Sequence, residues 1–409
     1  MFPIQIPFHV AQPNWDEIPA APGVFALFGE EEHAEPYISR TPNLRRRIRR
    51  LLDARPDQSK RLQLAGRVVR IEIALTGSDF EALLRLYEAT SAAFGERARK
   101  RLHLKSPSLL RMTVENAYPR VYVTHRISKA GMADLYGPFP SRVAAERFCE
   151  DMLDLFKLRR CVEDLAPDPA FPGCVYSEMK KCLAPCFQGC TDARYGEEAA
   201  AVRAFLRTRG ESLVEALKRE RDQASELMEF EKAAELHTRL TRAEAVAAEV
   251  AEAVRPLAHL DGVVVQAAAE PDHVALFRLA KGSLKGPAFV SVAGMRHPNE
   301  AAGSTSLFAQ PLGGPEAIPL EGPVVTAATR DELDLRLESS LAELTPATKR
   351  QRAKVRTGEV ADYLCLFSRW YYRPQSKRAG EIVFAGDDGK VPAKVLLRAI
   401  SRVWQKSNV

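Results

Sequence analysis

The sequence lacks the features that would assign it to a membrane, secreted or disordered class. No uninterrupted apolar run reaches the roughly 20 residues of a membrane-spanning helix, and the start MFPIQIPFHV has no basic segment of the kind that opens a signal peptide. Only 7 of 409 residues are cysteine, which argues against a disulfide scaffold. No Walker A loop, zincin helix or nucleophile elbow supports an ATPase or hydrolase. We therefore expect a cytoplasmic protein without membrane contact.

The composition is that of an ordinary folded protein with its positive charge concentrated locally. Hydrophobic residues make up 46% and charged residues 27% of a chain long enough for two to four domains. The net charge is only +6, yet five arginines crowd one short segment, and a second basic group spans residues 97–105. Such clusters suit a phosphate backbone, whereas the simpler alternative is a solvated helix face. The first group comprises Arg45, Arg46, Arg47, Arg49 and Arg50.

Four of the seven cysteines lie within 26 residues. They are Cys161, Cys174, Cys182 and Cys186. The Pro- and Gly-containing loop PDPAFPG, between the first two, allows the chain to fold back, and the CLAPC segment lets the last two thiolates converge on one ion or cluster edge. The alternative is four unrelated reduced cysteines. We interpret them as ligands, with Cys190 as a further candidate. Spacing alone does not choose between zinc and an iron-sulfur cluster.

The words PGVF, PYIS and NLRRRIRRLL occur in this order between residues 22 and 52. They resemble the GIY-YIG nuclease module in the version found in the UvrC family, the incision subunits of the bacterial excinuclease ABC. The resemblance implies that Tyr37 acts on the attacking water and that Arg47 stabilises the phosphate. It also implies a glutamate that holds one Mg²⁺ or Mn²⁺ ion, because a phosphodiester transition state gathers negative charge.

Several positions depart from the pattern of this module. Phe25 stands where the first motif has tyrosine, Ser39 replaces the glycine of the second motif, and Leu51 falls where the family usually has tyrosine. Ungapped alignment of SDFEALL with the family places Leu86 at the position of the metal-binding glutamate. Glu88 can serve as the metal ligand only if that alignment shifts by two residues. Two hypotheses therefore remain open: an incision enzyme of impaired activity, and a DNA-binding or partner-binding scaffold that does not cut.

The charged segment after the cysteines predicts an antiparallel helical hairpin. Leu213, Leu217, Ala224, Leu227 and Met228 form one apolar stripe, and a second stripe follows on the returning helix. The wording MEFEKAAELHTRL resembles the UVR motif through which UvrC pairs with a UvrB-like partner. That resemblance makes Phe230 the candidate exposed contact residue, with an intramolecular staple at the turn as its alternative.

The remaining segments extend the resemblance. YPRVYVTHR and LYGPFPSRVAAERF resemble the strand, turn and helix that precede the cysteines in UvrC, and the CLAPC ending implies a [4Fe-4S] cluster, with zinc as the alternative. Ser141 is the candidate cap of that helix, and Phe148, Met152, Leu155 and Phe156 recur at the helical spacing of core residues. Beyond residue 256, three short strands, the last two joined by the turn KGSLKG, precede a helix for which Thr329 and Glu332 form a candidate capping box. Together with an aromatic helix and EIVF, this order resembles the one found in UvrC before its RNase H-like nuclease. Neither that nuclease nor the helix-hairpin-helix part is expected here.

These observations predict an α+β protein in four parts that acts on damaged DNA in nucleotide excision repair. The parts are a GIY-YIG-like domain (residues 15–105), an extension with the cysteine cluster (106–200), a UVR-like hairpin (201–255) and a C-terminal α/β domain (256–409). Tyr37, Arg47 and Glu88 are the predicted catalytic residues. The predicted DNA-binding residues are Arg40, Arg45, Arg46, Arg49 and Arg50.

Overall fold

The computed structural model describes residues 2–31, 34–53, 64–128, 131–163, 165–295, 329–344, 356–386 and 388–407. Within these ranges the chain forms three antiparallel sheets of four strands each, with helices packed against them. The predicted α+β class is therefore confirmed. Among the described helices, none combines the length and the hydropathy that crossing a bilayer requires.

The N-terminal unit is a sheet with strand order β1-β4-β2-β3. Its first strand precedes residue 15, where we expected this domain to begin. Helix α1 covers one face, because Leu44, Ile48 and Leu52 are buried against the core residues Phe25 and Ile71. The elements are β1 (Ile4–Pro7), β2 (Gly23–Gly29), β3 (Tyr37–Thr41), α1 (Leu44–Leu52), β4 (Val68–Leu75), α2 (Asp79–Phe94) and α3 (Arg97–Arg101).

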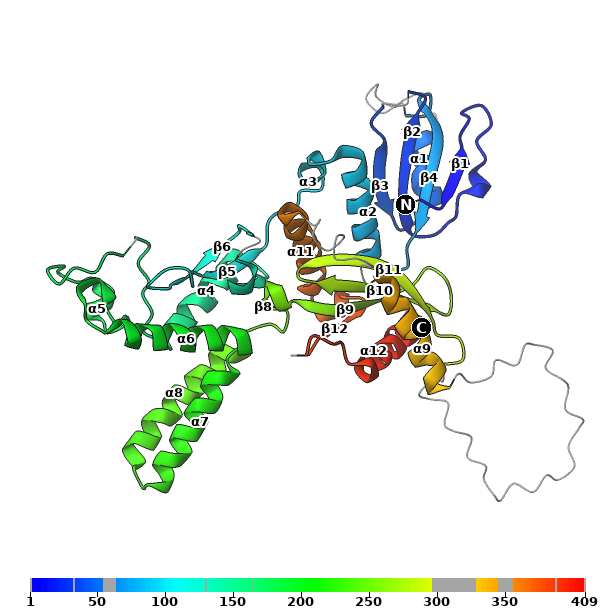
Figure 1. Cartoon of the computed structure of the whole chain (residues 1–409). Coiled ribbons are helices and arrows are strands. Elements are labelled where there is room, and N and C mark those ends of the chain that lie inside the picture. The colour runs from blue at the N-terminus through cyan, green and yellow to red at the C-terminus, as the bar shows by residue number, and fades with distance from the viewer. Residues whose placement is uncertain are drawn as a thin grey trace, which may run out of the picture.

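The middle unit is built around the sheet β6-β5-β7-β8. Helix α4 begins as predicted, with the Ser141 hydroxyl accepting the amide of Ala144 at 3.1 Å, and Phe148, Met152 and Phe156 are buried against α6. Helices α7 and α8 project from this unit as a separate hairpin (Figure 1). The elements are β5 (Ser108–Met112), β6 (Val121–Thr124), β7 (Leu135–Phe139), α4 (Arg142–Leu153), α5 (Val175–Glu178), α6 (Asp192–Thr208), α7 (Glu211–Glu226), α8 (Phe230–Ala248) and β8 (Arg255–Pro256).

The C-terminal unit is a sheet with order β11-β10-β9-β12 and helices on both faces. The predicted capping box is confirmed, because the Thr329 amide donates to Glu332 and the Glu332 amide donates to the Thr329 hydroxyl. The predicted turn KGSLKG is shorter than expected, since β11 already begins at Ser283. Residues 296–328 and 345–355 of this predicted domain lie outside the described ranges. The elements are β9 (Asp261–Ala267), β10 (His273–Ala280), β11 (Ser283–Ser291), α9 (Arg330–Leu344), α11 (Thr357–Tyr371), β12 (Glu381–Phe384) and α12 (Ala393–Ser407).

Side-chain alternation in β9 and β10 gives this sheet two apolar faces. Val263 and Leu276 contribute to the core under α9 and α12, whereas Val264 and Phe277 contribute to the core under α11. The second core also includes Phe80 from α2 of the N-terminal unit. Helix α2 therefore joins the two units, and it lies between them in Figure 1.

Candidate nucleic-acid interface and cysteine site

A surface pocket of about 930 Å³ lies along α1 and the end of β3. The Asn43 side chain caps α1 by accepting the Arg46 amide at 2.8 Å. Because the apolar residues of α1 face the sheet, its arginines lie on the outer face. All the predicted DNA-binding arginines line the pocket, and Arg47 joins them. The lining residues are Ala20, Arg40, Thr41, Pro42, Asn43, Arg45, Arg46, Arg47, Arg49, Arg50 and Asp53.

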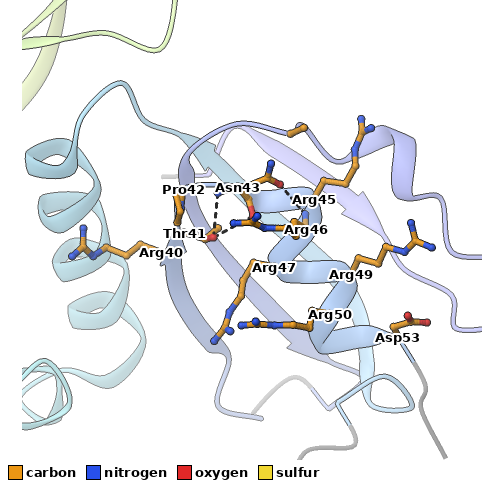
Figure 2. Close-up of a pocket in the computed structure, with 11 residues that line it drawn as sticks. Arg40, Thr41, Pro42, Asn43, Arg45, Arg46, Arg47, Arg49, Arg50 and Asp53 are labelled. Atoms are coloured by element: carbon orange, nitrogen blue, oxygen red, sulfur yellow. Dashed lines mark hydrogen bonds between the residues drawn. The ribbon is translucent and has the colours of Figure 1, made fainter.

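Most of the α1 guanidinium groups have no counter-charge in the described part of the chain. Arg45 is the exception, because its Nε donates to the Ile18 carbonyl at 2.7 Å and its Nη1 lies 3.6 Å from an Asp16 carboxylate oxygen. Figure 2 shows the Arg47 and Arg50 side chains pointing to the same side of the helix. Unpaired guanidinium groups at this density are suited to phosphate oxygens.

Tyr37 lies in β3, next to but not within this pocket. It is half-buried, and its ring centroid is 6.1 Å from that of Phe25 on β2. Phe25 pairs with Ser39 in the β2–β3 register, so the three positions lie together. Because side chains alternate along a strand, Arg40 points away from the face that carries Tyr37. Figure 2 shows Arg40 directed toward α2.

Glu88 lies on α2 and is not among the residues that line the arginine pocket. Burial raises the pKa of its carboxyl to about 7, with Arg85 opposing that shift. Burial also raises the pKa of Tyr363 on α11, and the charge of Glu88 adds to that shift. Glu88 therefore lies near α11 of the C-terminal unit. The structure does not bring it together with Arg47, and its role as a metal ligand stays a prediction. Leu86, at the ungapped position of the metal glutamate, is half-buried on the same helix.

Asp79 is the acidic residue that the structure places beside Arg40. Its two carboxylate oxygens lie 2.7 Å from Arg40 Nη1 and 3.0 Å from Arg373 Nη1. Partial burial acts to raise the pKa of Asp79, but the hydrogen bonds and charges of Arg373 and Arg40 outweigh it, so the net shift is downward. Sequence reasoning missed this residue. Its place at a helix start follows from the Ser78 cap, but its pairing with residue 373 has no local signal.

The four predicted ligand cysteines are free thiols that lie in one loop region. The pKa of Cys182 is raised to about 11, chiefly by burial and further by the charges of the other three thiols. The Ala184 amide donates to its sulfur at 3.3 Å. A four-thiol donor set fits zinc or an iron-sulfur cluster. Still, within the described part of the chain no group of three or more His, Cys, Asp or Glu side chains is arranged to hold a metal ion.

Arg159 is a buried cation beside this loop that sequence reasoning missed. The residue is only 2% exposed to solvent. The guanidinium donates to the carbonyls of Tyr118 and Glu163, both at 2.9 Å, and Nη1 lies 3.5 Å from the Cys161 sulfur. Metals bind the thiolate form of cysteine, so a guanidinium at this position would balance part of the negative charge of a four-thiolate site.

The tip of the helical hairpin is apolar and exposed. Phe230 is 69% exposed, so the alternative of an intramolecular staple is not supported. Leu227 and Met228 are also exposed, and their assignment to the buried stripe was wrong, because α7 ends at Glu226 and Met228 takes a left-handed turn conformation. The stripe is otherwise formed as predicted, with Leu217 and residues of α8 in one small core.

Comparison with known proteins identifies the middle unit and the hairpin. Residues 108–205 match the family described as "UvrC/Cho excinuclease, middle domain", and residues 211–246 match the "UvrB/uvrC motif". No solved structure matches the chain.

Curated relatives carry the name "UvrABC system protein C". The protein of Carboxydothermus hydrogenoformans is 26% identical over 359 residues, which cover 86% of this chain and 57% of that protein. The protein of Symbiobacterium thermophilum is 29% identical over 276 residues, which cover 66% of this chain and 42% of that protein. The protein of Idiomarina loihiensis is 27% identical over 222 residues, which cover 52% of this chain and 34% of that protein.

The chain thus spans 57% or less of the length of these relatives. The matches include the cysteine loop and the hairpin, whereas the arginine pocket lies before the segments that match the two family models. Residues 108–205 and 211–246 are thus similar to the middle domain of the UvrC/Cho excinucleases and to the UvrB/uvrC motif, and the chain as a whole is similar to proteins named UvrABC system protein C.

Proposed function

We propose that this chain acts on damaged DNA in nucleotide excision repair, where it binds the strand through the arginine pocket and makes a metal-dependent incision. The observation that carries this proposal is the concentration of guanidinium groups around α1, next to the strand that holds Tyr37. The relationship to UvrABC system protein C supplies the biological context. Electrostatic stabilisation of a phosphoryl transition state requires such cations close to the reacting phosphate.

In this proposal Arg47 neutralises the charge on the scissile phosphate, and Tyr37 positions the attacking water. A bound Mg²⁺ or Mn²⁺ would supply Lewis-acid stabilisation of the same phosphate. Arg40, Arg46, Arg49 and Arg50 hold the flanking backbone. The described pocket includes one carboxylate, Asp53, at the end of α1.

The test is strand cleavage by the full chain on a lesion-bearing duplex with a UvrB protein, ATP and either Mg²⁺ or Mn²⁺. We expect Arg47→Ala to abolish cleavage at saturating DNA, whereas Arg49→Ala, from the same helix, weakens binding and leaves saturated cleavage intact. Tyr37→Phe should lower the rate without changing affinity. Intact DNA under all these conditions, with binding retained, would refute the incision step.

One observation favours a second function, a scaffold that binds DNA and a partner without cutting. Glu88 is not among the residues that line the arginine pocket, which leaves the predicted metal ligand away from the proposed phosphate site. In a scaffold, Arg47→Ala and Arg49→Ala would weaken DNA binding alike, and no metal would be required. The paired variants therefore separate the two functions.

The cysteine loop is proposed to hold a [4Fe-4S] cluster, with zinc as the alternative, through Cys161, Cys174, Cys182 and Cys186. Metal binding in such loops is coupled to their ordering, so an incompletely closed donor set is compatible with a site that forms on loading. Anaerobic purification followed by iron, sulfide and zinc analysis decides the identity of the metal. Cys182→Ala should lose the metal, while Cys149→Ala, a buried thiol on α4, should retain it.

The exposed hairpin tip is proposed to bind a UvrB-like protein through Phe230. The match of residues 211–246 to the UvrB/uvrC motif and the exposure of this ring support the contact. An exposed aromatic residue surrounded by apolar neighbours is the usual centre of such an interface.

A further inference from the structure

A second pocket, of about 490 Å³, adjoins the arginine pocket at the N-terminus of α2. The two pockets share Arg40, Thr41 and Pro42, so a strand lying on α1 continues into the second pocket. We propose that this second pocket binds an internal phosphate group of a nucleic-acid strand and that the C-terminal unit contributes to its charge. The inference deepens the proposed function and rests on it for the identity of the strand.

The backbone at the start of α2 offers unused hydrogen-bond donors. Ser78 caps the helix by accepting the Glu81 amide at 3.1 Å, and the Gly77 amide donates to the Glu81 carboxylate at 2.9 Å. The amides of Asp79 and Phe80 have no acceptor among the hydrogen bonds of the described residues. Unpaired amides at the start of a 16-residue helix, together with its dipole, favour an anion.

A buried hydroxyl provides an independent indication of a ligand. Thr76 lines the pocket and is 2% exposed, yet its Oγ1 has no hydrogen-bond partner in the described part of the chain. Leaving such a group unsatisfied costs about 1–3 kcal/mol, so buried hydroxyls are normally paired. A phosphate oxygen entering the pocket would supply the missing acceptor.

The charge around the pocket matches a phosphodiester. Arg40 and Arg373 share the single carboxylate of Asp79, which leaves one positive charge in excess. Glu81 adds no net charge, because it is fully buried and paired with Arg85 at 2.8 Å. One excess positive charge balances the single negative charge of an internal phosphate.

The C-terminal unit contacts two residues that line this pocket, Asp79 and Gly77. Arg373 follows α11, and Gly77 lies so close to Ala267 and Ala268 at the end of β9 that an added Cβ would overlap their backbone. The loop that carries Thr76 is therefore held against the C-terminal sheet. Phosphate binding at this position depends on both units being docked.

The experiment compares Thr76→Val with Thr90→Val in the full chain. Thr90, on α2, carries a buried hydroxyl that already donates to the Leu86 carbonyl at 2.6 Å, and it lies outside the pocket. Thermal unfolding is measured in phosphate and in chloride at equal ionic strength, and binding of a labelled duplex is measured by anisotropy. We expect the wild-type chain and Thr90→Val to be stabilised by phosphate.

Thr76→Val should be at least as stable as wild type in chloride, because it removes an unpaired hydroxyl. It should lose the stabilisation by phosphate and bind duplex about threefold to tenfold more weakly, the equivalent of one hydrogen bond. Thr76→Ser, which keeps the hydroxyl, should restore both. A phosphate response in Thr76→Val equal to that of wild type would overturn the proposal, as would equal losses in both valine variants.

Asp79→Asn tests the charge argument. Removing the carboxylate frees both guanidinium groups, so duplex affinity should rise and its salt dependence should steepen by about 0.9 in log–log slope. Weaker binding by this variant would contradict the proposed balance of charge. A nicked duplex with a 5′-phosphate could also bind better than the same duplex with a 5′-hydroxyl. If that difference requires Thr76, the pocket binds the end of a strand, and the proposal of an internal phosphate is refuted. A Thr76-dependent phosphate response without duplex binding would refute the DNA function and leave the pocket as an anion site.

Discussion

The docking of the N-terminal unit on the C-terminal unit is predicted to depend on one aromatic side chain, Phe80. This residue of α2 is 2% exposed, and its ring centroid lies 5.1 Å from those of both Phe277 and Trp370. Replacing a fully buried phenylalanine with alanine costs about 3–5 kcal/mol, which includes the lost ring contacts. We therefore expect Phe80→Ala to lower the local stability of α2 by that amount.

The ion pair at the same boundary is expected to matter far less. Arg373 and Asp79 have side chains that are 30% and 56% exposed, and pairs of this kind contribute about 0–1 kcal/mol. Arg373→Gln is thus the matched control, since it changes the boundary without opening its core. Phe80→Ala should exceed it by at least about 2 kcal/mol.

Hydrogen exchange measured by mass spectrometry is the appropriate assay, because a chain of several units does not unfold in a single two-state step. Amides of α2 should exchange faster in Phe80→Ala, and those of the hairpin α7–α8 should not change. Equal effects of Phe80→Ala and Arg373→Gln, or an effect of Phe80→Ala below about 1 kcal/mol, would refute the view that apolar contact holds the units together.

Three further predictions concern single side chains. The pKa of Glu88 is raised to about 7 in the folded state, so between about pH 4.5 and 7 the native state binds more protons than the unfolded chain. The free energy of unfolding should therefore fall as the pH rises through that window. Glu88→Gln should flatten this dependence when unfolding is measured by chemical denaturation. Phe230→Ala should leave the melting temperature unchanged and weaken binding to UvrB, whereas Leu236→Ala should destabilise the hairpin by about 2–5 kcal/mol. Arg159→Met should reduce metal retained per chain on titration with a chelator, and Arg159→Lys should not restore it, because one ammonium cannot reproduce three directed hydrogen bonds.

Local patterns predicted local structure well. The spacing of Phe148, Met152 and Phe156, the caps at Ser141 and Thr329, and the hairpin between residues 211 and 248 all follow from signals within a few residues. The hairpin tip was wrong at Leu227 and Met228, because periodicity continues in the sequence where the backbone has already turned. These successes and this error share one cause, the short range of the sequence signal.

Contacts between distant segments had no such signal. The pairing of Asp79 with Arg373 joins residues 294 positions apart, and the bond from Tyr87 to Asp362 spans 275. The arginines of α1 were predicted from their density alone, but the direction of Arg40, away from Tyr37 and toward α2, required the sheet. Glu88 illustrates the same limit, since its position in the sequence did not reveal that it lies outside the arginine pocket.

Helix α11 connects a part of the chain without a predicted active site to the candidate nucleic-acid interface. Its Trp370 packs against Phe80 of the N-terminal unit, and Tyr372, directly after the helix, donates to the Pro138 carbonyl of the middle unit at 2.6 Å. Arg369 Nη2 donates to the carbonyl of His103, in the segment that connects those two units, at 2.5 Å. One helix thus contacts the unit with the arginine pocket and the unit with the cysteine loop. If the pocket binds DNA as proposed, loosening the contact of Phe80 should weaken that binding without removing any arginine.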